Sequence, residues 1–154
     1  TSFSRSLQIN LRINLDGTKG AQLYTEAVIK GVGILLNLPY YYGRAGEQYA
    51  FFRIPKLLLT DERFAEVSTD AKLLYGLLLD RMELSYRNGW IDEQNRVFII
   101  FTAEEVMSTL HCRSEKAARL FAELDSSKGI GLIERKRQGL GRPTLIYVKD
   151  FSGA

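Results

Sequence analysis

Residues 102–124 read TAEEVMSTLHCRSEKAARLFAEL and predict two short helices joined by a tight turn. Thr102 and Glu105 form a capping box, in which a hydroxyl and a carboxylate satisfy free backbone amides at the start of the first helix. Apolar residues recur at helical spacing on both sides of a break at residues 111–113, and Ser114 fits the N-cap of the second helix. This pattern predicts a helix-turn-helix, in which the first helix supports the second.

The segments around this unit complete a recognisable order of elements. Residues 132–138 and 144–148 have strand-like patterns and flank a turn that contains glycine and proline, which indicates a β-hairpin. Upstream, a long helix begins at the N-cap Ser68, and residues 96–101 read as a strand because they are β-branched and aromatic. The order helix, strand, helix, turn, helix, hairpin predicts an α+β fold, a winged helix-turn-helix domain.

The predicted helix after Ser68 is apolar over much of its circumference. Besides the face that repeats at helical spacing, a second face carries Leu73, Leu77 and Leu84. We therefore expect this helix to be either the centre of a small bundle or a contact with another subunit.

The first 38 residues differ from the rest of the chain. Leu7–Leu15 alternate between apolar and polar residues, which predicts a half-buried strand closed by an Asp-Gly turn. Residues 21–38 are apolar without a clear period, and their pattern assigns no element. We expect residues 1–38 to form a strand-containing N-terminal arm or a leader, and residues 39–154 to form the winged-helix domain.

Positive charge is concentrated near the C-terminus. Residues 1–110 contain 12 Lys and Arg against 13 Asp and Glu, whereas residues 111–154 contain 9 against 5. The positive excess therefore falls on the predicted helix-turn-helix and hairpin, which is typical of a surface that binds a polyanion. The alternative is a basic loop that only favours solubility.

The second short helix is the candidate reader of double-stranded DNA, because a helix fits the major groove and its first turns reach base edges. Arginine and lysine donate to guanine and phosphate, and a serine beside free amides suits a phosphate oxygen. The alternative is a solvated face on which Lys116 and Arg119 pair with Glu115 and Glu123. The candidate DNA-binding residues of this helix are Arg113, Ser114, Lys116 and Arg119.

The hairpin is the second candidate contact with DNA. Its cations can follow the phosphates or enter a minor groove, and its glycines allow a close backbone approach. The alternative is that lysine and arginine only protect a strand edge from aggregation, which explains the charge but not its coincidence with the helix pair. The candidate residues here are Lys136, Arg137, Gln138, Arg142 and Thr144.

The sequence offers little to an enzyme. One histidine and one cysteine cannot fill a zinc site or a facial triad, and the acidic pairs are sequence neighbours that do not face each other. No Walker motif occurs, and each Gly-x-Gly lacks the third glycine of a dinucleotide fingerprint. We expect no catalysis, no cofactor and no metal, and we expect Cys112 to be a small buried apolar residue rather than a nucleophile.

Several observations favour a cytoplasmic protein. No apolar run approaches the roughly 20 residues of a membrane span, and no export signal opens the sequence. A single cysteine cannot form an internal disulfide, which suits a reducing compartment.

Five stretches between residues 39 and 151 match a known family. They read YAFFRIPK (49–56), AKLLYGLLLDRMELS (71–85), NGWID (88–92), VFIIFT (97–102) and GIGLIERKRQGLGRPTLIYVKDF (129–151). The set resembles the N-terminal domain of the RepA family of plasmid replication initiators, found on theta-type plasmids and integrative elements of Gram-positive bacteria. Residues 1–38 have no counterpart in this family.

The resemblance implies a winged-helix domain, usually a homodimer, that binds repeated sites at a plasmid origin. It also implies a separate C-terminal domain, beyond this chain, that recruits host replication proteins. By position, the resemblance places Ser114, Lys116 and Arg119 on the recognition helix and Lys136, Arg137, Gln138 and Arg142 on the wing.

The residues and the resemblance predict the same function. We expect sequence-specific, non-catalytic binding of double-stranded DNA at a replication origin, with paired domains on successive half-sites. Two alternatives remain open at this point. One is a transcriptional repressor with the same fold, and the other is a protein-docking winged helix of a replication complex, whose leucine-rich helix and hairpin contact protein.

Overall fold

The computed structural model describes residues 27–30, 33–44 and 50–153 of the chain. Contacts divide the chain into two compact units, residues 1–49 and residues 50–154.

The first unit contains an antiparallel hairpin formed by β1 (Ala27–Lys30) and β2 (Gly33–Leu36). The apolar stretch to which the sequence pattern assigned no element therefore contains two strands. The strand expected at residues 7–15 lies outside the described residues. The sequence patterns set the start of the main domain at residue 39, whereas the second unit begins at residue 50.

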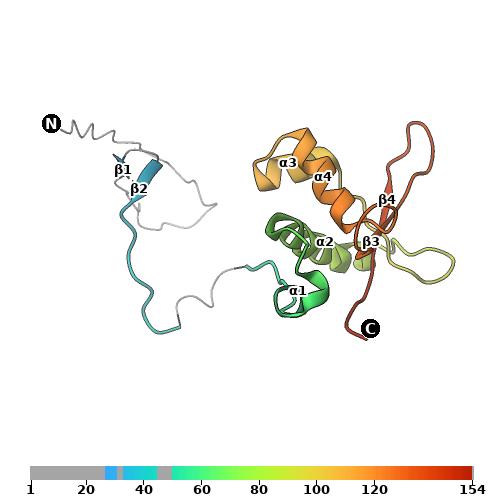
Figure 1. Cartoon of the computed structure of the whole chain (residues 1–154), viewed down its shortest axis with the longest axis horizontal. Helices are drawn as coiled ribbons and strands as arrows, with labels where there is room; N and C mark the ends of the chain where they lie inside the picture. The colour runs from blue at the N-terminus through green and yellow to red at the C-terminus, as the bar shows by residue number, and fades with distance from the viewer. Residues whose placement is uncertain (1–26, 31–32, 45–49, 154) are drawn as a thin grey trace. The chain divides into compact units, whose positions relative to one another are not determined.

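The second unit contains helices and a small antiparallel sheet in the order that the sequence predicts for a winged helix (Figure 1). After two short helices, α1 and η2, come helices α2, α3 and α4, and the hairpin of β3 and β4 follows them. The elements are α1 (Leu57–Thr60), the 3-10 helix η2 (Glu62–Phe64), α2 (Thr69–Arg87), α3 (Ala103–Leu110), α4 (Ser114–Leu124), β3 (Ile133–Lys136) and β4 (Leu145–Val148).

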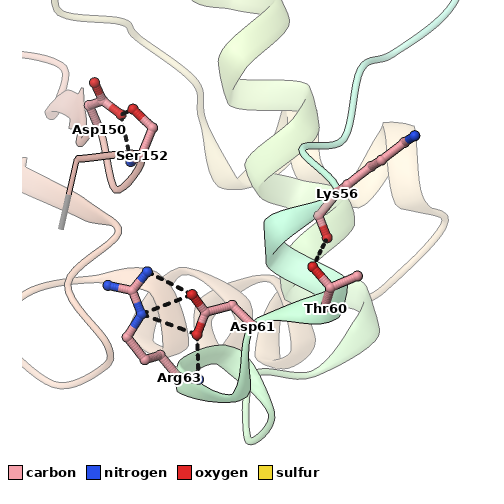
Figure 2. Close-up of polar contacts among 6 residues, drawn as sticks. All are labelled: Lys56, Thr60, Asp61, Arg63, Asp150 and Ser152. Atoms are coloured by element: carbon pink, nitrogen blue, oxygen red, sulfur yellow. Dashed lines mark hydrogen bonds and ion pairs between the residues drawn. The ribbon is translucent and has the colours of Figure 1, made fainter.

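Local polar contacts shape the two short helices before α2 (Figure 2). The Thr60 hydroxyl donates to the Lys56 carbonyl at 3.1 Å. The Asp61 carboxylate accepts from the Arg63 backbone amide at 2.9 Å and from the Arg63 guanidinium at 2.7 Å. These bonds hold the pKa of Asp61 below its usual value. They cap η2, whose last residue, Phe64, is buried in the core.

A similar turn places the C-terminal end of the chain against the same region (Figure 2). The Asp150 carboxylate accepts from the backbone amide of Ser152 at 2.8 Å and from its hydroxyl at 2.6 Å. Phe151, between them, packs with its ring centroid 5.0 Å from that of Phe64 and 5.7 Å from that of Tyr75. The segment after β4 therefore closes over η2 and α2.

Helix α2 begins as predicted and is buried on one of its two apolar faces more than on the other. Ser68 is the N-cap, and its hydroxyl accepts a hydrogen bond from the amide of the third helical residue. Leu77 is buried, whereas Leu73 and Leu84 are 41% and 50% exposed. The second face is therefore only partly covered within this chain.

The helix-turn-helix forms with one correction at the start of α4. Both bonds of the capping box between Thr102 and Glu105 are present, and His111 ends α3 in the left-handed conformation with φ of 52°. The expected N-cap, Ser114, is wrong by one residue, because Arg113 has the extended backbone of an N-cap and makes no side-chain capping bond. A serine already inside the helix cannot cap the amides that follow it.

The core lies between α2, α4 and the hairpin, with α3 packed on α4. Leucine and other aliphatic side chains at helical and strand spacing meet there, as the predicted elements require. The largest fully buried side chains are Leu58, Leu74, Leu78, Ile99, Val106, Leu120, Leu124, Ile133 and Ile146.

The strand predicted at residues 96–101 is reduced to isolated bridges. Ile99 exchanges two backbone hydrogen bonds of 2.9 Å with Ile146 of β4. This segment forms only isolated bridges and no extended ladder. The preceding residues stay in a loop because the Arg96 amide and guanidinium both donate to the Asp92 carboxylate at 2.8 Å. The prediction of a strand was therefore wrong in length, although its central residue does join the sheet.

Candidate nucleic-acid interface

Three of the four residues predicted for the second helix lie exposed in its first half. Arg113 is the N-cap of α4, Ser114 is its first residue, and Arg119 lies in its second turn. Neither arginine forms an ion pair with a carboxylate of the described residues. Both guanidinium groups are therefore available at the surface to an anionic ligand.

Lys116, the fourth residue, is held by another helix. Its Nζ lies 2.6 Å from Oδ2 of Asp70 in the first turn of α2, and both side chains are partly exposed. The alternative pairing of this lysine with Glu115 or Glu123 does not occur. Lys116 thus joins the helix-turn-helix to α2, and its charge is partly neutralised there.

Glu123 makes a second connection between α4 and the start of α2. Its carboxylate accepts from the Ser68 amide at 2.9 Å and from the Ser68 hydroxyl at 2.7 Å. A carboxylate is favourable at this place because the N-terminus of a helix carries partial positive charge. With the Lys116–Asp70 pair, this contact fixes one side of α4 against α2.

The remaining exposed side of α4 includes residues that the sequence analysis left out of the candidate site. Glu115 and Ala118 are exposed together with Arg119, at the spacing of three and four that places side chains on one helical face. A small side chain at 118 lets the helix backbone approach a ligand closely. The buried face of α4 contains Ala117, Leu120 and Phe121 at helical spacing. This spacing in the sequence already indicates that the exposed face lies on the opposite side of the helix.

The cations of the hairpin lie where the sequence placed them. Lys136 ends β3, and Arg137 and Arg142 lie in the loop that follows; all three are exposed. None of them pairs with an acidic side chain within the described part of the chain. Thr144, at the other end of the loop, is half-buried.

Arg135, in the middle of the same basic run, turns inward instead. Its Nε lies 2.7 Å from Oδ2 of the buried Asp125, and its guanidinium lies 5.3 Å from the centre of the Phe121 ring. Burial alone would raise the pKa of Asp125, but the hydrogen bond and charge of Arg135 outweigh it and hold that pKa below its usual value. This pair joins the C-terminal end of α4 to β3.

Gln138 closes the base of the hairpin loop. Its Nε2 donates to the Pro143 carbonyl at 2.7 Å, and within the loop the Arg142 amide donates to the Gly139 carbonyl at 3.3 Å. Gly139 and Gly141 have φ of 104° and 74°, which residues with a side chain rarely adopt. The amide predicted to contact DNA therefore shapes the loop, and a contact with DNA stays a prediction for it.

The basic side chains of α4 and the hairpin thus fall into two groups. Lys116 and Arg135 are paired and join elements of the fold, and Lys149 lies 3.8 Å from Glu134. In the view of Figure 1, the α3–α4 pair and the loop between β3 and β4 both lie above α2. The group without an acidic partner among the described residues consists of Arg113, Arg119, Lys136, Arg137 and Arg142.

A family model described as "Replication initiator protein A (RepA) N-terminus" matches residues 50–154. The chain belongs to this family. A "41 kDa protein" of Lactobacillus helveticus is 30% identical to it over 89 residues, which cover 58% of this chain. The chain spans only 24% of the length of that relative.

Solved structures similar to this RepA N-terminal domain have related descriptions. One described as "N-Terminal domain of DNA binding protein" is 30% identical with a TM-score of 0.59, and covers 74% of this chain and 85% of its own. "Structure of Rep-DNA complex" is 30% identical with a TM-score of 0.59, over 73% and 84%. "Structure of MDR initiator" is 27% identical with a TM-score of 0.57, over 73% and 86%. The predicted α+β winged-helix fold is confirmed by this likeness.

The described residues of this RepA N-terminal domain contain neither a metal-binding cluster nor a membrane-spanning helix. Within residues 27–30, 33–44 and 50–153, no three His, Cys, Asp or Glu side chains are grouped to hold a metal ion. No described helix has the length and apolar character needed to cross a membrane. Cys112 is partly buried and packs against the core.

Proposed function

We infer that this domain binds double-stranded DNA sequence-specifically at a plasmid replication origin, without catalysis. One observation carries the proposal. On α4 and the hairpin, the cations needed for the fold are paired, and five others have no acidic partner in the described chain. A fold that leaves these charges unneutralised on two neighbouring elements suits a ligand with many phosphates.

The comparisons support the same conclusion. The family is one of replication initiators, and a solved relative at 30% identity is described as a complex of a Rep protein with DNA. Another similar structure is described as that of an initiator. These descriptions favour an origin over a promoter as the site of binding.

In the proposed mode of binding, α4 enters the major groove and the hairpin contacts the adjoining backbone or minor groove. Arg119 donates to a guanine edge, because a guanidinium matches the two acceptors of that base. Ser114 and the free amides at the start of α4 bind a phosphate. The partly exposed second face of α2 suits the contact of a homodimer, which would place two such helices on successive repeats.

We also propose that host replication proteins bind the initiator through a separate domain, as the resemblance to the RepA family implies. The chain spans 24% of the length of the similar "41 kDa protein". A domain that acts at a plasmid origin works in the cytoplasm.

The test is a titration of the chain with duplexes from the parent plasmid origin and with scrambled duplexes of equal composition. We expect tight binding to origin repeats only, and we expect Arg119→Ala to lose about 1 to 3 kcal/mol on the origin duplex and to relax preference at one position. Equal affinity for origin and scrambled duplexes would contradict sequence-specific recognition. Binding confined to promoter DNA would favour a repressor instead.

A further inference from the structure

The tip of the hairpin carries a leucine with no intramolecular neighbours. Leu140 has a relative exposure of 106%, so neither the neighbouring backbone nor any other side chain covers it. A single exposed leucine has no meaning by itself, since much of any protein surface is apolar. Here, however, the leucine lies in the middle of the loop between β3 and β4, between two glycines with positive φ.

The loop that presents Leu140 is closed by hydrogen bonds rather than left open. The Gln138 side chain donates to the Pro143 carbonyl across its base at 2.7 Å, and the Arg142 amide donates to the Gly139 carbonyl. Below the loop, β3 and β4 pair from Lys136 opposite Leu145 downward. These bonds restrict the conformations of the loop, which reduces the conformational entropy lost when the tip enters a ligand.

The charges around the tip indicate what this ligand is. Arg137 precedes Leu140 and Arg142 follows it in the same loop, and neither has an acidic partner in the described residues. A protein pocket for the leucine would bury these cations, which is costly without paired carboxylates. A DNA groove, in contrast, offers phosphates on its two edges and apolar sugar and base surface between them.

We propose that Leu140 inserts into the minor groove as an apolar wedge that partly unstacks one base step. The proposal rests on the DNA binding proposed above and adds a second source of specificity. Proteins that wedge an apolar side chain between bases kink the duplex, and the energy of the kink depends on the step. The hairpin would thus select flexible pyrimidine–purine steps, while α4 reads base edges.

The experiment compares the wild-type chain with Leu140→Ala on an origin duplex that carries 2-aminopurine at successive positions. We expect wild type to raise the fluorescence at one step and to bend the duplex, measured by energy transfer between its ends. Leu140→Ala should bind about tenfold more weakly, as loss of apolar contact predicts, and should abolish both signals. Because Leu140 touches nothing in the fold, the variant should unfold at the wild-type temperature.

Two controls make the result specific. Leu59→Ala removes a leucine that is 65% exposed on α1 and should leave affinity, fluorescence and bend unchanged. Leu140→Met keeps the apolar reach and should retain both signals. Replacing the unstacked step by a stiff one should weaken wild type but have little effect on Leu140→Ala.

The outcomes separate this proposal from the function on which it rests. If wild type binds origin duplexes and Leu140→Ala matches it in affinity and bend, the wedge is wrong and the DNA-binding function stands. If Leu140→Ala changes the oligomeric state in sedimentation but not the bend, the leucine contacts protein and the wedge is equally overturned. Failure of wild type to bind any origin duplex overturns both proposals.

Discussion

The division of cations into paired and unpaired groups makes a quantitative prediction about salt. Each phosphate neutralised by a cation adds about 0.9 to the slope of log affinity against log salt concentration. Arg119 is assigned to a base edge, so if each of the other four unpaired cations meets one phosphate, the slope is about −3.6 for each bound domain. Arg142→Ala removes one of these four, and we expect a slope of about −2.7.

The assay is fluorescence anisotropy on a labelled origin duplex, with salt varied from about 50 to 200 mM. Arg87→Ala is the matched control, because Arg87 is also an exposed arginine but lies at the end of α2 and pairs with Glu83. We expect this variant to keep the wild-type slope. Equal reduction of the slope by both substitutions would show that net charge, and not the position of the unpaired cations, determines binding, and would refute the reasoning.

Three further predictions concern stability and specificity. Gly129→Ala should lower the free energy of unfolding by about 2 kcal/mol or more in urea titrations, because its Cβ would lie 2.1 Å from the Glu123 carbonyl oxygen. Asp125→Asn should lower it by about 1.5 kcal/mol at pH 7. Since the folded pKa of Asp125 is depressed, its contribution is present above the unfolded pKa of about 3.9, and the difference between variant and wild type should shrink as pH falls from that value through the lower folded pKa. Glu115→Gln should weaken discrimination for cytosine at one position in a binding-site selection, because a carboxylate accepts from the cytosine amino group; an unchanged consensus would remove Glu115 from the reading face.

Local signals in the sequence predicted the elements of the domain well. The capping box of Thr102 and Glu105, the N-cap at Ser68 and the turn between the two hairpin strands each depend on residues a few positions apart. Such contacts form wherever the backbone takes the corresponding shape, and the order of the elements that they mark predicted the winged helix, which the family resemblance also implied. The prediction of a strand at residues 96–101 was wrong in length. The composition of these residues is typical of a strand, but a loop contact with Asp92 bends the start of the segment away.

The roles of individual cations were harder to predict, since they depend on partners distant in the sequence. Glu123 meets Ser68 across 55 positions, and Lys116 meets Asp70 of another helix. The composition of the basic run in and after β3 gave no reason to distinguish one cation from another. In the structure, however, Arg135 turns toward Asp125, while its basic neighbours stay exposed. The packing of α4 against α2 and β3 decides which cations form ion pairs within the fold.

The ion pair between Asp125 and Arg135 has a geometric consequence for the DNA. It ties the end of α4 to the first strand of the hairpin, so the two elements proposed to contact DNA are joined to each other. In the proposed complex, the protein therefore sets the distance between the places on a duplex that α4 and the hairpin touch. A site with one base pair inserted between those two places would present the right bases at the wrong interval.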